Sequence, residues 1–134
     1  MAKRDPSTFG NDTASDWSYD LEENDDLSLI EATLQDVYGA EPGDYIEAPD
    51  AEAAVAAAEV LAWLLGKPGN ESSSTEKIAA WVESHALQPS PALLKKAVAV
   101  LDRIEGENSE LAEKWADNDE WTAVMSDLRT RLTA

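Results

Sequence analysis

The segment from Pro49 to Leu65 constrains the fold of this chain more than any other part of the sequence. Six of its first ten residues are alanine, the residue with the lowest free-energy cost of helix formation. Pro49 suits the first helical position, and Gly66 and Pro68 are typical of residues that follow a helix end. Because the segment is apolar nearly all round from Val60 onward, it predicts a helix buried at the centre of a helical bundle.

The same signals predict helices on both sides of this central segment. Apolar residues recur every three or four positions, with capping residues before each stripe and Gly or Pro after several of them. The expected helices lie at residues 11–21, 27–38, 49–65, 73–84, 90–105, 109–115 and 118–132. We therefore expect an all-α fold, a single domain over residues 1–134 built as a bundle of six or seven helices, with residues 1–10 flexible.

Short polar motifs predict where several of these helices begin and end. Side chains of Asn, Asp and Ser accept hydrogen bonds from the first N–H groups of a helix, and Ser73 with Glu76 has the spacing of a capping box. His85 stands at an expected helix end, where a histidine complements the helix dipole. Tyr45 and Ile46 are too few for a strand and have no evident partner. The other candidate N-terminal caps are Asn11 or Asp12, Asp25 or Asp26, Asn108 or Ser109, and Asn118 or Asp119.

The distribution of charge is the second strong feature of the sequence. The chain has 28 acidic and 10 basic residues, a formal net charge of −18. No basic residue lies between Arg4 and Lys67, so acids there lack a local ion-pair partner, whereas pairs such as Glu110 with Lys114 are available farther on. Folding does not select for such self-repulsion, because it destabilises a compact state. The acidity also disfavours direct nucleic-acid binding, since phosphates require a basic surface.

Several classes of chemistry lack the residues they require. Without cysteine, the chain has no disulfide, thiolate metal site or cysteine nucleophile. Its one histidine, His85, offers no zinc-ligand spacing, and the sequence has neither a Gly-x-Ser-x-Gly elbow nor a P-loop. A calcium loop that starts at Asp16 fails, because Leu21 and Leu27 stand where Gly and Glu are needed. We therefore expect no enzyme, cofactor or metal and, since no run of about 18 apolar residues or apolar leader occurs, a cytoplasmic protein without a membrane partner.

Three stretches of the sequence resemble one family. Residues 9–21 contain an aromatic residue, an Asn-Asp pair, an Ala, an Asp-Trp pair and an acidic-Leu step, and residues 45–66 and 121–132 extend the similarity over most of the chain. On these motifs the chain resembles the bacterial family catalogued as domain of unknown function 4259. The Trp-Gly pair that usually precedes the aromatic residue in that family is replaced here by Arg4–Thr8. The resemblance implies a small, mostly helical bacterial protein, and it supplies no reaction, cofactor or catalytic residue.

The acids between Asn11 and Leu27 have two interpretations. In the structural one, Ala14, Trp17 and Leu21 form an apolar helix face, and the acids are simply solvated. In the functional one, the acids form a contiguous anionic surface that binds a partner. The surface consists of six acids and is called the acidic surface below: Asp16, Asp20, Glu22, Glu23, Asp25 and Asp26.

The tryptophans also divide into two groups. Trp63, Trp81 and Trp121 lie on apolar stripes, so we expect them in the core. Trp115 follows Lys114 on a short expected helix, where a partly exposed ring is available to a partner.

Three hypotheses of function follow from these features. The first is an interaction protein that binds and neutralises a basic protein, as an immunity protein does with a basic toxin such as a nuclease, or as a nucleic-acid mimic does with a nucleic-acid-binding protein. In the second, the acids serve only solubility. The third is a carboxylate-dependent enzyme, for which the sequence shows no positive feature.

Overall fold

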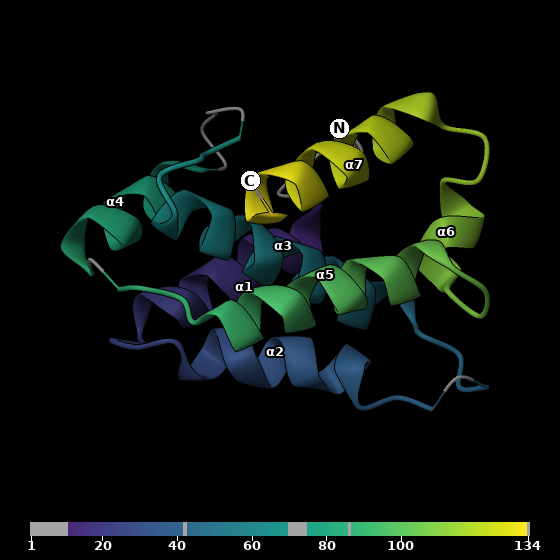
Figure 1. Ribbon diagram of the computed structural model, residues 1–134, viewed down its shortest axis with the longest axis horizontal. Helices are drawn as coiled ribbons and strands as arrows, with labels where there is room; N and C mark the ends of the chain where they lie inside the picture. Colours follow the sequence, from purple (N-terminus) through teal and green to yellow (C-terminus); the bar gives the residue numbers. More distant parts are fainter. Residues whose placement is uncertain (1–10, 42, 70–74, 86, 134) are drawn as a thin grey trace.

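Seven α-helices form most of the described part of the chain, which comprises residues 11–41, 43–69, 75–85 and 87–133 of the computed structural model (Figure 1). They are α1 (Asp12–Glu22), α2 (Ser28–Tyr38), α3 (Ala48–Leu64), α4 (Glu76–Ser84), α5 (Pro91–Glu105), α6 (Glu110–Lys114) and α7 (Asp119–Thr133). No β-strand occurs within those ranges, which confirms the predicted all-α bundle. The predicted flexibility of residues 1–10 and the predicted cap at Ser73 lie outside the described residues.

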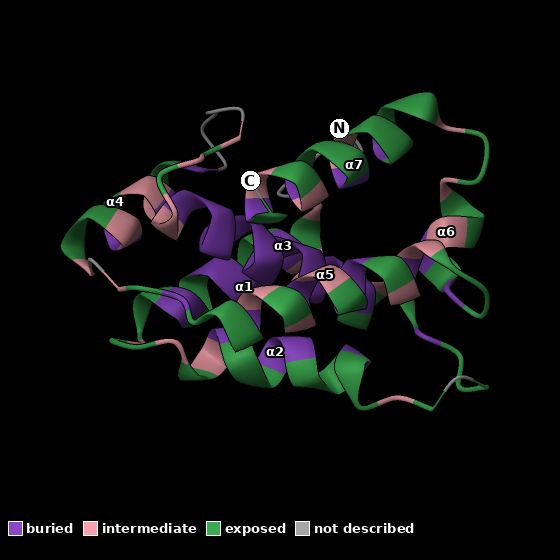
Figure 2. Ribbon diagram, in the orientation of Figure 1, coloured by how far each residue is buried: buried purple, intermediate pink, exposed green. Residues whose placement is uncertain are grey.

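Helix α3 lies at the centre of the bundle, as the alanine-rich sequence predicts. Twelve of its 17 residues are buried, and it contacts each of the other six helices (Figures 1 and 2). Because alanine side chains are short, neighbouring helices approach α3 closely. Helices α2 and α5 pack on each other and on α3, while α7 packs on α3 and α5. Within the described ranges, no helix combines the length and the apolar character needed to cross a membrane.

Most helix starts follow the predicted capping chemistry. At the start of α1, the Asn11 side-chain oxygen accepts the backbone N–H of Ala14 at 2.7 Å. Such a bond satisfies a donor that has no partner inside the helix. The side chains that act in the same way on α5, α6 and α7 are Ser90, Ser109 and Asn118.

The start of α2 differs from the prediction. Leu27 occupies its N-cap position and offers no side-chain cap, so the predicted cap at Asp25 or Asp26 is wrong in position. Asp26 lies one residue earlier, and its carboxylate accepts the Ser28 N–H at 3.0 Å. This occurs because an aspartate reaches the N–H two residues ahead by a local turn, which satisfies the same donor from outside the helix.

Ile46 also departs from the prediction, because it does have a partner. It forms an isolated parallel bridge with Ser109, in which the Ile46 N–H donates to Asn108 at 2.8 Å and the Glu110 N–H donates to Ile46 at 2.9 Å. The Tyr45 hydroxyl donates to a carboxylate oxygen of Glu113 at 2.7 Å beside this bridge. The partner lies far along the chain, in the α5–α6 connection, and no local pattern reveals it.

Candidate functional site

The apolar face of α1 attaches the acidic surface to the bundle. Ala14, Trp17 and Leu21 are buried, as the spacing predicts. The Trp17 indole N–H donates to the Thr33 hydroxyl of α2 at 2.9 Å, and Thr33 in turn donates to the Leu29 carbonyl. A buried indole with a satisfied N–H fixes the rotation of α1 about its axis, so Asp16 and Asp20 are held on the opposite, solvent-facing side.

The structure places all six acids of the acidic surface in solvent. Each is exposed, and Asp16, Asp20 and Glu23 follow one another at helical spacing along one ridge of α1 and its end. Figure 2 shows the exposed outer side of the helices in green. Within the described residues, no Lys or Arg forms an ion pair with any of the six acids; the one ion pair there is between Asp25 and His85. The excess of negative charge without a Lys or Arg counter-ion is therefore a property of this surface as well as of the sequence.

Helix α4 and its C-terminal end supply the only two basic side chains that the described structure brings against this surface. His85 is at its C-terminal end, where Nδ1 donates to the Trp81 carbonyl at 2.9 Å and Nε2 lies 3.2 Å from an Asp25 carboxylate oxygen. The Trp81 carbonyl, and then Asp25, raise the pKa of His85 above its ordinary value of 6.5. The helix-end role predicted for His85 is confirmed, and its contact with Asp25 adds a link between α4 and the α1–α2 connection.

Lys77 is the second of these basic side chains, and it lies against the exposed ring of Tyr19. The Lys77 ammonium is 4.1 Å from the ring centroid, and 54% of Tyr19 is exposed. The pKa of Lys77 is raised, first by its interaction with the Tyr19 side chain and further by the charges of Glu22 and Glu76. Sequence reasoning missed both residues of this contact, because no local signal connects α1 with a lysine on α4.

Trp115 does not join the acidic surface. It is half-buried and packs against the core, as its position on a short helix predicts, and Lys114 lies 5.4 Å from its ring centroid. Figure 1 shows α6 at one end of the molecule and the α1–α2 connection at the other.

Lys114 also lies 3.8 Å from the buried carboxylate of Glu52, so the predicted pairing of Lys114 with Glu110 is wrong. The Glu110 carboxylate instead accepts the Ala48 N–H at 2.8 Å.

The prediction that three tryptophans lie in the core is confirmed, and the indole N–H groups of two of them donate hydrogen bonds. Trp63, Trp81 and Trp121 are all buried. The Trp81 indole donates to the Asn24 carbonyl at 2.9 Å, which holds α4 against the end of α1. The Trp63 indole donates to the Glu59 carboxylate at 2.9 Å.

Glu59 is the centre of a buried ion pair that sequence reasoning missed. Its side chain is 3% exposed and accepts two hydrogen bonds from the Arg131 guanidinium, at 2.6 and 2.8 Å. The Gly69 N–H donates to the same carboxylate at 3.2 Å, and Asp127 binds the remaining side of Arg131. Glu52 and Glu59 are seven positions apart in the segment 51–63 of α3, which is otherwise apolar. Two acids inside such a segment are the signal that marks them as partnered rather than solvated.

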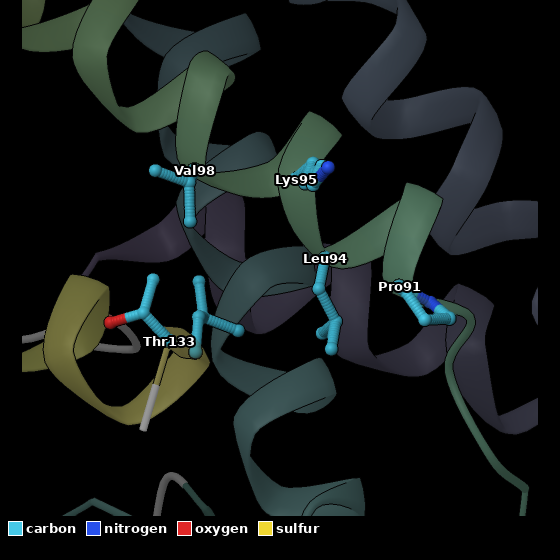
Figure 3. A pocket seen from close by; sticks show the side chains of 6 residues that line it. Pro91, Leu94, Lys95, Val98 and Thr133 are labelled. Atoms are coloured by element: carbon cyan, nitrogen blue, oxygen red, sulfur yellow. The ribbon is translucent and has the colours of Figure 1, made fainter.

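An open groove with mainly apolar lining residues lies between α5 and α7. It has a volume of about 350 Å³ and is lined by Pro91, Leu94, Lys95, Val98, Leu132 and Thr133. Figure 3 shows Leu94 and Val98 extending from α5 toward Thr133 of α7. The lining offers one ionisable group, Lys95, and elsewhere in the described residues no three His, Cys, Asp or Glu side chains gather as a metal site requires.

Comparison with known proteins identifies the family. The model of the family described as domain of unknown function 4259 matches residues 5–127. This chain belongs to that family. The matched region contains helices α1 to α6 and the whole acidic surface. Neither the curated proteins nor the solved structures gave a match.

Proposed function

We propose that this protein binds a basic protein through the acidic surface of α1 and the α1–α2 connection. The observation that carries the proposal is the exposure of all six carboxylates without a Lys or Arg ion pair among the described residues. Folding alone gives no reason to gather unpaired like charges, because their repulsion opposes a compact state. A cationic partner would remove that repulsion when it binds.

The physical advantage of such a surface is fast and selective association. A localised patch of one sign attracts a partner of the opposite sign and raises the association rate by about 10- to 1,000-fold. It also repels nucleic acid and other anionic molecules. An immunity protein that blocks the cationic cleft of a toxin, or a mimic that occupies a nucleic-acid-binding site, uses this chemistry.

We propose that the acidic surface binds a partner and does not catalyse a reaction. The α5–α7 groove has mainly apolar lining residues, and the acidic surface carries its carboxylates in solvent rather than in a closed cavity. We place the interaction in the cytoplasm, and the sequence without cysteine supports that part of the proposal.

The test is charge reversal of the three acids along the α1 ridge, Asp16→Lys, Asp20→Lys and Glu23→Lys. A matched control reverses Glu107, Asp117 and Glu120, three exposed acids on the α5–α6 connection, after α6 and at the start of α7. Both triple variants change net charge equally, and neither alters a buried side chain.

Tagged wild-type protein and both variants are used for affinity purification at low and at physiological salt, and the association kinetics of a retained basic protein are then measured. We expect wild type and the control to retain a basic protein at physiological salt, and the ridge variant to lose at least about tenfold in association rate. Equal losses in the two variants would mean that only overall charge matters. If wild type retains no basic protein, the acids serve solubility and the proposal is wrong.

A further inference from the structure

Tyr19 is the exposed aromatic side chain of α1, between Asp16 and Asp20 in the sequence. Aromatic rings attract cations to their faces within about 6 Å of the centroid, and the Lys77 ammonium already lies there, at 4.1 Å. More than half of Tyr19 is nevertheless exposed, at 54%. The ring therefore has an accessible area in addition to the part that Lys77 covers.

The carboxylates around Tyr19 distinguish it from Tyr38, the other exposed ring that contacts a lysine. On α1, Asp16 lies three residues before Tyr19 and Glu23 lies four residues after it, positions that share one side of a helix. Glu22 follows by three residues, and its charge acts on the ammonium of Lys77. Tyr38 also has a lysine near its ring, Lys96 at 5.1 Å, but it lies at the end of α2, outside the acidic surface.

We infer that Tyr19 and its flanking carboxylates form a receptor for an arginine side chain of the basic partner, with Lys77 as an internal cation that shares the site. The inference rests on the proposed function and names the anchor of that same surface. A guanidinium stacks on an aromatic face and donates to two carboxylate oxygens at once, and it is more weakly hydrated than an ammonium. Arginine is therefore the better ligand for a ring with an anionic rim.

The experiment compares binding of hexa-arginine and hexa-lysine peptides, which carry the same charge, by isothermal titration calorimetry. We expect wild type to prefer hexa-arginine by about 2- to 5-fold, the range given by a cation–π contact at an exposed site. Tyr19→Leu removes the ring but no charge, so it should abolish this preference. Lys77→Gln removes the internal competitor, and it should tighten hexa-arginine binding more than Lys95→Gln, which removes one exposed positive charge on α5.

The outcomes separate this inference from the proposed function. The inference is wrong if Tyr19→Leu keeps the arginine preference, or if Lys77→Gln and Lys95→Gln behave alike. In that case, the triple reversal of Asp16, Asp20 and Glu23 still weakens both peptides and the proposed acidic surface stands. If wild type binds neither peptide, or if the triple variant binds both as wild type does, both proposals are overturned.

Discussion

On the α3–α7 side of the molecule, the carboxylate of Glu59 is buried and accepts hydrogen bonds from Arg131, Trp63 and Gly69, whereas on α1 the carboxylates of Asp16 and Asp20 are exposed. A buried carboxylate requires such partners, because removal from water strongly disfavours an unpaired charge. An exposed carboxylate has no such requirement. The comparison separates acids that hold two helices together from acids that remain available to another molecule.

The cations of the molecule are divided in the same way. Arg129 pairs with Asp102 and Glu105, and Arg131 pairs with Glu59 and Asp127, so both arginines of α7 are engaged within the bundle. The acidic surface receives contacts from Lys77 and His85 only, among the described residues, and both come from α4. The comparison predicts that removal of an α7 arginine lowers stability more than removal of an exposed α1 carboxylate does.

The largest expected effect comes from Arg131→Met, which leaves the Glu59 carboxylate buried without its counter-ion. We expect the free energy of unfolding to fall by about 3 kcal/mol or more, the usual effect of breaking a buried pair on one side. Urea denaturation measures it. Arg129→Met is the control, because its side chain is 31% exposed and its partners Asp102 and Glu105 are 64% and 24% exposed, and a loss under about 1 kcal/mol is expected there. Equal losses of unfolding free energy in the two variants would mean that burial does not determine how much each ion pair stabilises the fold.

A smaller effect is expected from salt. Raising the ionic strength from about 0.01 M to 0.15 M shortens the Debye length from about 30 Å to about 8 Å, so the repulsion among the acids weakens. We expect the melting temperature to rise over this range. The triple variant Asp16→Asn, Asp20→Asn and Glu23→Gln should show a smaller rise, as differential scanning calorimetry would reveal. A flat curve for wild type would mean that the exposed acids are spaced widely enough not to oppose folding.

The smallest expected effect concerns the contact of His85 with Asp25. While Nδ1 donates to the Trp81 carbonyl, Nε2 donates to Asp25 only when the ring is protonated, so the pKa of His85 is raised above 6.5. The contact therefore stabilises the fold fully below pH 6.5, and this contribution is lost as the pH rises through the raised pKa. An NMR titration of the ring should show a midpoint above 6.5, and Asp25→Asn should lower it. A wild-type midpoint at or below 6.5 would contradict the contact.

Sequence reasoning located the helices of the fold and the acids of the candidate site, but not the contacts among them. The apolar face of Trp17 and Leu21 predicts how α1 packs, and the same periodicity predicts that Asp16 and Asp20 face solvent. Lys77 could not be assigned to that surface, because its position beside Tyr19 depends on how α4 packs against α1. Trp115 was correctly expected to be partly exposed, yet its distance from the acids was not visible in the sequence.

The sequence by itself determined the all-α fold, the central place of α3 and the excess of negative charge in its first half. These properties depend on residues close together in the chain, through capping, helical periodicity and composition. Only the tertiary structure decided which residues distant in sequence contact one another. It joins Glu59 to Arg131, Ile46 to Ser109, and the face of Tyr19 to Lys77. The physical reason is that each of these contacts unites helices or loops distant in sequence, and their geometry is set by how whole helices pack rather than by any local pattern.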